Sequence, residues 1–174
     1  GSMQAPSSDL PVIRTAMTLR GDGSGATISG SNQRRVLQID DTGLVLLENL
    51  TLLDGEVSGV SSIGGAALLI EDSEVTLRNV NVRLNEVEGG ILQGGGVRSM
   101  NSVLRVEDSL FEMNKAGVTF QGSSRGGNIA VIGGHATIMR SPLRGYQFED
   151  YNFVYLESYG AHRGGGAWAD DEQM

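Results

Sequence analysis

The feature that most constrains this chain is a segment of alternating residues that returns about every 30 residues. In residues 75–85 apolar side chains alternate with polar ones, and Asn79 interrupts the alternation. Similar segments occupy residues 45–55 and 104–114, and a weaker copy occupies residues 136–143. The anchor positions, 30, 29 and 32 residues apart, are Leu47, Leu77, Val106 and Ile138. A fixed period of this length indicates a repeat architecture.

Each repeat contains three short segments with the alternation typical of β-strands and none typical of a helix. A glycine pair opens the repeat, as at Gly64 and Gly65, and an apolar strand follows at residues 67–70. Equivalent strands of neighbouring coils then pair about 4.8 Å apart. We therefore predict an all-β, single-stranded parallel β-helix of about five coils, right-handed as parallel crossovers prefer.

Stacking of coils also explains polar residues that recur at fixed places in the repeat. The corner between two strands needs a residue that tolerates the left-handed backbone conformation, which Asn and Asp do. A second set of amides closes the segment, and an apolar set faces inward. The predicted corner column is Asn49, Asn79 and Asp108; the amide column is Asn85 and Asn114 above Gly55; the inward column is Leu52, Val82, Phe111 and Leu143.

Composition changes at both ends of the repeat array. Residues 1–11 begin with Gly-Ser-Met and continue as a polar leader, which we interpret as a tag scar and leader. Residues 12–145 hold the β-helix repeats. Residues 146–174 are rich in aromatic side chains and end just after a new glycine cluster, so we predict an excursion or cap that leads into a further partial coil. The chain is interpreted as a fragment of a longer protein.

Charge and composition exclude several classes of protein. The formal net charge is −8, from 21 acidic and 13 basic residues, which disfavours nucleic acid as a partner. No apolar run approaches the ~20 residues that span a bilayer, so we predict no membrane span in this fragment. The chain has no cysteine, which excludes disulfides and thiol catalysis.

The repeat elements resemble the Gly-Gly-Ala and Phe-x-x-Asn repeat pair of the chlamydial polymorphic membrane proteins. Phe111 and Asn114 match Phe-x-x-Asn in full, and residues 64–67 approximate the glycine element, whereas residues 82–85 carry Val in place of Phe. The resemblance implies a right-handed β-helix, an extracellular or cell-surface location, and an adhesive or structural role without a cofactor. The leading interpretation is a non-enzymatic module for adhesion or for use as a rigid scaffold. The chain lacks the cysteines that are frequent in those proteins.

An acidic stack carries the main alternative. Asp40, Asp41, Glu71 and Asp72 end two strands one period apart, and four carboxylates could hold Ca²⁺ through oxygen ligands. The pectate-lyase-like fold of polysaccharide lyases, hydrolases and epimerases is also a β-helix, and such enzymes need clustered carboxylates with a basic residue. The sequence shows no arginine or lysine column beside the stack, and solvated corners explain the same residues.

Aromatic residues suggest a binding surface for a glycan or a surface protein. Alternating positions place three of the candidates on one face of a strand, although packing that covers the open end of the solenoid explains them too. A third hypothesis is a structural unit that self-associates end to end. The candidate ligand-binding residues are Tyr151, Phe153, Tyr155, Tyr159 and Trp168.

One acceptor sequence for N-linked glycans lies in the corner column, at Asn49, Leu50 and Thr51. A glycan would clash with the column if the Asn49 amide pointed inward. We therefore expect the sequence to be unused, whatever the compartment.

Overall fold

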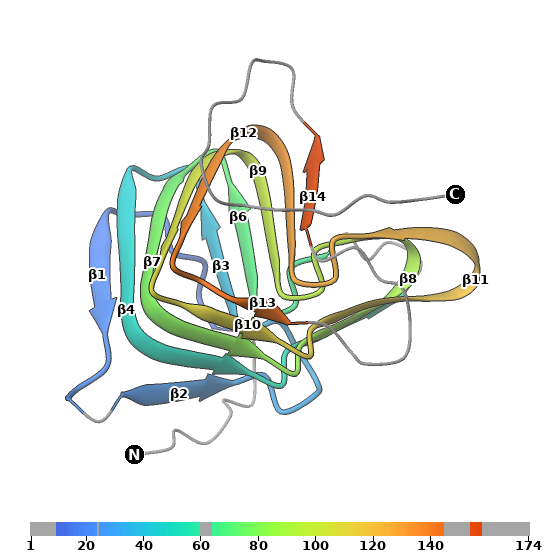
Figure 1. Ribbon diagram of the computed structural model, residues 1–174, viewed down its shortest axis with the longest axis horizontal. Coiled ribbons are helices and arrows are strands. Elements are labelled where there is room, and N and C mark those ends of the chain that lie inside the picture. Colours follow the sequence, from blue (N-terminus) through green and yellow to red (C-terminus); the bar gives the residue numbers. More distant parts are fainter. Residues whose placement is uncertain (1–9, 24, 60–63, 145–153, 158–174) are drawn as a thin grey trace.

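The computed structural model describes residues 10–23, 25–59, 64–144 and 154–157. Every regular element there is a β-strand, and all strand pairings are parallel. The chain winds into a β-solenoid of about four turns (Figure 1). The predicted parallel β-helix is therefore confirmed. In the described part of the chain, each wall of the solenoid stacks five strands, as the predicted five coils require. The four intervals between five stacked strands correspond to about four turns.

Three walls form the solenoid, and each wall stacks equivalent strands from successive coils. The first wall contains β3 (Leu37–Asp40), β6 (Leu68–Glu71), the first parts of β9 (Val97–Glu107) and β12 (Ile129–Met139), and β14 (Val154–Glu157). The second wall contains β1 (Met17–Arg20), the first parts of β4 (Leu44–Leu53) and β7 (Glu74–Arg83), and the second parts of β9 and β12. The third wall contains β2 (Ala26–Ser29), the second parts of β4 and β7, β10 (Leu110–Glu112) and β13 (Leu143–Arg144).

A separate three-stranded sheet leaves the corner between the third wall and the first wall. We call this sheet the excursion; it is distinct from the segment predicted at residues 146–174. Its strands lengthen from 4 to 8 to 11 residues along the chain. Figure 1 shows β8 and β11 projecting from the coils at this corner. The excursion contains β5 (Glu56–Gly59), β8 (Glu86–Gln93) and β11 (Lys115–Arg125).

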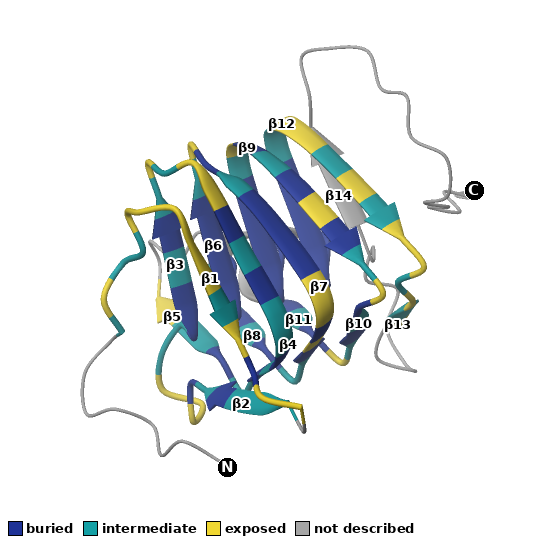
Figure 2. Ribbon diagram, turned by 90° about the vertical axis from the view of Figure 1, so that its left-hand side faces the viewer, coloured by how far each residue is buried: buried dark blue, intermediate teal, exposed yellow. Residues whose placement is uncertain are grey.

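The core is built from inward columns that follow the repeat. Leu47, Leu77 and Val106 pair in register along the second wall, with Ile138 next, and the first three are 0% exposed. This arrangement places the four sequence anchors in one column. Figure 2 shows the alternation of buried and more exposed residues across the same wall. The inward column of the third wall joins Leu52, Val82, Phe111 and Leu143.

Left-handed backbone marks the corners between walls. Asn49, Asn79 and Asp108 have φ values of 55°, 51° and 48°, and Arg140 continues the column at 48°. Asn79 Nδ2 donates to Asn49 Oδ1 at 2.8 Å. Short polar side chains tolerate this conformation best, which explains why the alternation of the repeat breaks at these positions. A second corner column, between the first and second walls, contains Asp41, Asp72 and Asn101.

The amide column lies inside the corner from which the excursion leaves. Asn85 is 0% exposed and Asn114 is 4% exposed, and Asn85 Nδ2 donates to Asn114 Oδ1 at 2.8 Å. Asn85 Oδ1 accepts from the backbone N–H of Gly55 at 2.7 Å, as the predicted position of Gly55 beneath the column requires. Asn114 Nδ2 donates to Asn128 Oδ1 at 2.8 Å. Asn128 thus extends the column, and the repeat did not predict this third amide.

The opening glycines of the repeat are needed where the excursion returns to the first wall. Gly64 has a φ of 110°, and a Cβ there would lie 1.7 Å from the Gln93 carbonyl oxygen. Both the conformation and the close approach exclude a larger residue.

Candidate functional site

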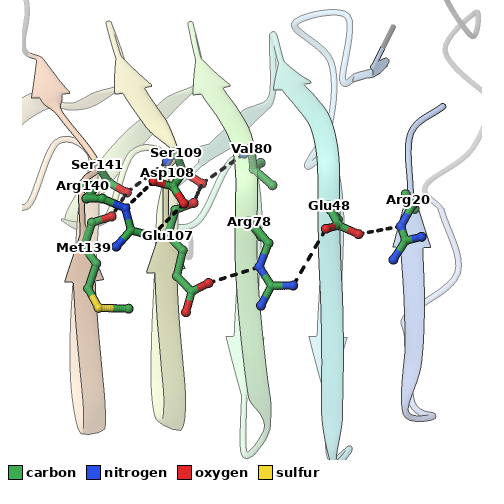
Figure 3. A network of polar contacts seen from close by, with 10 residues as sticks. All are labelled: Arg20, Glu48, Arg78, Val80, Glu107, Asp108, Ser109, Met139, Arg140 and Ser141. Carbon is green, nitrogen blue, oxygen red and sulfur yellow. Dashed lines mark hydrogen bonds and ion pairs between the residues drawn. The ribbon is translucent and has the colours of Figure 1, made fainter. Parts of the chain in front are cut away.

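Charged side chains of alternating sign run across the outside of the second wall (Figure 3). Arg20 Nε lies 2.5 Å from Glu48 Oε2, and Arg78 Nη1 lies 3.8 Å from Glu48 Oε1. Arg78 Nε lies 3.1 Å from Glu107 Oε2. Each residue comes from a different coil at the same register position. We call this row of four residues the charge ladder.

The neighbouring corner column ends in a bidentate ion pair. Arg140 Nε and Nη2 donate to the two Asp108 carboxylate oxygens at 2.5 and 2.8 Å. The hydrogen bonds from Arg140 hold the pKa of Asp108 below its usual value. Ser109 and Ser141 follow in the chain, and the Ser109 backbone N–H donates to Ser141 Oγ at 3.0 Å (Figure 3). Side chains therefore link neighbouring coils on this corner from Asn49 onward.

Ion pairs also join coils on the third wall and on the excursion. Glu112 Oε1 lies 3.5 Å from Arg83 Nε, and Glu112 Oε2 lies 3.9 Å from Arg144 Nη1. The two arginines belong to the coils on either side of Glu112. On the excursion, Lys115 Nζ lies 2.5 Å from Glu86 Oε1. Exposed pairs of this kind contribute about 0–1 kcal/mol each, so their main effect is to fix which residues stack.

The predicted acidic stack lies at the corner between the first and second walls. Asp40 and Glu71 are register partners at the ends of β3 and β6. Asp41 and Asp72 follow them in the left-handed corner, with φ values of 48° and 45°. The two pairs are therefore brought onto neighbouring coils, as the period predicts.

Each of the two strand-end carboxylates already has a polar contact. Asp40 Oδ2 lies 2.6 Å from Arg14 Nη1, and Glu71 Oε2 accepts from Gln38 Nε2 at 3.3 Å. The sequence shows no basic column beside the stack, but it did not reveal this single arginine, which precedes β1. Within the described residues, no three or more His, Asp or Glu side chains are placed to hold a metal ion. Calcium binding by this stack remains a prediction.

Arg98 is a second residue near this stack that sequence reasoning missed. It lies on β9 between register partners Leu69 and Ala130, and only 8% of it is exposed. Its Nη2 donates to Gln93 Oε1 at 3.3 Å, whereas Nε and Nη1 are buried without a hydrogen-bond partner. Burial lowers the pKa of Arg98 from its usual value, and the Glu71 carboxylate opposes this shift. An arginine near the start of a strand carries no sequence signal that it is buried.

The aromatic candidates lie almost entirely outside the described residues. Tyr151, Phe153, Tyr159 and Trp168 are beyond them. Tyr155 is in β14, where its backbone pairs with Ala130 of β12. The aromatic binding surface therefore remains a prediction.

Comparisons with known proteins give no family for this chain: no family model, no curated protein and no solved structure matches it. The resemblance to polymorphic membrane protein repeats accordingly rests on the sequence motifs alone. No helix in the described part of the chain has the length and apolar character to cross a membrane.

Proposed function

We propose that this chain is a rigid, non-enzymatic β-solenoid module of a cell-surface or secreted protein. In this role it is a scaffold that presents a binding surface to a surface protein or a glycan. The observation that carries the proposal is the continuity of polar side-chain contacts from coil to coil. These contacts occur on the second wall, the third wall, the corners and the excursion.

Rigidity follows from contacts that repeat between adjacent coils. Solenoid stability is approximately the sum of coil stabilities and of the interactions between neighbours. The described coils have inward columns that are largely 0% exposed, a buried amide column, and exposed ion pairs outside. Bending or shearing one coil against the next would strain all three sets of contacts together.

The excursion supports a role in presentation. It is the part of the repeat whose length varies most, while the three walls keep nearly the same register. Binding residues concentrate on segments that a rigid scaffold positions. In three successive coils the chain passes from the excursion to the first wall, and β14, which contains Tyr155, pairs with β12 on that wall.

The Phe-x-x-Asn motif has a structural explanation in this chain. Phe111 fills the inward column of the third wall, and Asn114 belongs to the buried amide column. The motif therefore supports the solenoid directly, and it supports a surface location only through the resemblance.

End-to-end assembly is a second candidate, favoured by one observation. Among the described strands, β1 pairs only with β4, and the second part of β12 pairs only with β9. Each therefore offers a free strand edge. A second copy stacked in strict register would, however, place its Ile13 over the first part of β12, where β14 already pairs. Assembly would require β14 to move.

The test is binding of the whole chain to arrays of glycans and cell-surface proteins. We expect saturable binding that Tyr155→Ser weakens and that Arg78→Gln leaves unchanged, because Arg78 is on the second wall. Incubation with acidic polysaccharides provides the contrast with the enzyme alternative. Product release that Asp40→Asn and Glu71→Gln abolish would contradict the scaffold proposal and favour a polysaccharide-acting enzyme. A mass in solution that increases with concentration would favour assembly.

A further inference from the structure

The glycan acceptor sequence lies on the outside of the solenoid. Leu50 is 3% exposed and belongs to the core, so Thr51, the next residue of the strand, faces away from the core. Asn49 and Thr51 are both partly exposed. The hydrogen bond between Asn79 and Asn49 is itself on the exposed surface. The Asn49 amide therefore stacks in the column on the outside of the solenoid and does not point inward, so the clash expected for an inward amide does not arise.

The Asn49 amide has the contacts that a glycosylated residue needs. Its Oδ1 accepts from Asn79 Nδ2, while its Nδ2 donates no hydrogen bond within the described part of the chain. On the preceding coil the residue equivalent to Asn49 is Gly21, because Arg20 is the register partner of Glu48. Because glycine has no side chain, Asn79 is the only described side chain stacked directly on Asn49 in its column. A sugar on Nδ2 would leave the bond from Asn79 intact.

The buried amides show why some asparagine side chains in this fold could not carry a glycan. Asn85 is 0% exposed, and its Nδ2 donates to the Leu52 and Arg83 carbonyl oxygens at 3.1 and 2.9 Å. Substitution of that nitrogen would break both bonds and open the core. Asn49 differs from Asn85 in exposure and in having an unused donor.

We propose that Asn49 is an N-glycosylation site. The proposal rests on the surface or secreted location given above. The donor is an oligosaccharide linked to a lipid pyrophosphate. Nδ2 forms a bond to the anomeric carbon, the bond from that carbon to the pyrophosphate oxygen breaks, and the amide proton leaves to solvent. Thr51 supplies the hydroxyl of the acceptor sequence. Transfer takes place before the corner folds, since the transferase needs an accessible segment.

A glycan at this position would divide the surface of the solenoid. Asn49 is at the corner between the second and third walls, whereas the excursion leaves from the corner between the third and first walls. A bulky, hydrated sugar would hinder partners from packing beside the charge ladder. The first wall and the excursion would remain open to a ligand.

The experiment is expression of the whole chain behind a heterologous signal peptide in a eukaryotic cell line. Digestion with an N-glycosidase and mass spectrometry then read occupancy at Asn49. We expect a glycan on most secreted molecules and its loss in both Asn49→Gln and Thr51→Ala. Translation in the presence of endoplasmic-reticulum membranes reads the transfer even for a variant that fails to fold or to be secreted.

The matched control is Arg83→Thr in the Thr51→Ala background, which creates an acceptor sequence at the exposed Asn81. An unmodified Asn49 in the parent chain would overturn the proposal. A glycan at Asn81 in the control variant would show that the cells modify an exposed acceptor on this chain. The signal peptide makes this result independent of the native location. A result that disproves the surface or secreted location is therefore distinguished from one that disproves the glycosylation site.

Discussion

Replacing Asn114 by Ala tests whether the buried amide column holds neighbouring coils together. The Asn114 side chain accepts from the Asn85 backbone N–H at 3.2 Å and from Asn85 Nδ2 at 2.8 Å. Its own Nδ2 donates to the Val82 carbonyl oxygen at 2.9 Å and to Asn128 Oδ1 at 2.8 Å. One side chain therefore contacts three parts of the chain.

The size of the effect follows from the groups that would lose their partner. Asn85 Nδ2 keeps its bonds to backbone carbonyl oxygens, but the Asn85 backbone N–H and Asn128 Oδ1 have no second partner among the described residues. Each buried, unsatisfied polar group costs about 1–3 kcal/mol. Asn114→Ala should therefore lower the free energy of unfolding by about 2–6 kcal/mol, a large share of the ~5–15 kcal/mol typical of a domain.

Equilibrium unfolding in urea, followed by circular dichroism, measures this loss, with the slope compared between variants to check cooperativity. Asn79→Gly is the matched control, because it removes one exposed amide bond while glycine keeps the left-handed corner. We expect the control to cost less than about 1 kcal/mol. Equal losses in the two variants, or a loss below about 1 kcal/mol for Asn114→Ala, would refute the reasoning.

Three further predictions concern the core, an ion pair and the acidic stack. Ser99 is 0% exposed with an unpaired hydroxyl, so Ser99→Val should raise the thermal midpoint, with a gain of about 1–2 kcal/mol; a lower midpoint would mean overpacking. The lowered pKa of Asp108 means that its stabilising contribution is present above the ordinary carboxyl pKa and is lost as pH falls through the lowered value. Melts in acid should therefore show a smaller acid-induced drop in midpoint for Asp108→Asn than for the parent chain, and identical drops would count against the pair. If the acidic stack binds calcium, millimolar calcium should raise the thermal midpoint and Asp40→Asn should abolish the rise; an unchanged midpoint would contradict the cation site.

The repeat period predicts which residues share a column, because equivalent strands pair in register. It therefore places Leu47 next to Leu77, and Asn85 next to Asn114, on neighbouring coils without knowledge of any contact. Asn128 escapes this reasoning because it joins the column from the far side of the excursion, 14 residues after Asn114. A contact within one coil leaves no periodic trace.

The orientation of side chains at corners is the other limit of the sequence. In a strand, alternation tells which side chains face the core, but a left-handed residue interrupts the alternation. The direction of the Asn49 amide could not be read from its neighbours for this reason. Arg14 was missed for a different reason. It precedes the first full repeat, so no copy of it recurs to reveal its pairing with Asp40.

The alternating signs of the charge ladder bear on how such an array changes in length over time. Positive and negative residues occupy successive coils in the order Arg20, Glu48, Arg78 and Glu107. Duplication of one coil would set two like charges side by side, and deletion of the coil that carries Glu48 would stack Arg20 against Arg78. Like charges at directly opposite positions on neighbouring strands are destabilising. Duplication or loss of two coils keeps the alternation, so evolution of the array should favour even steps.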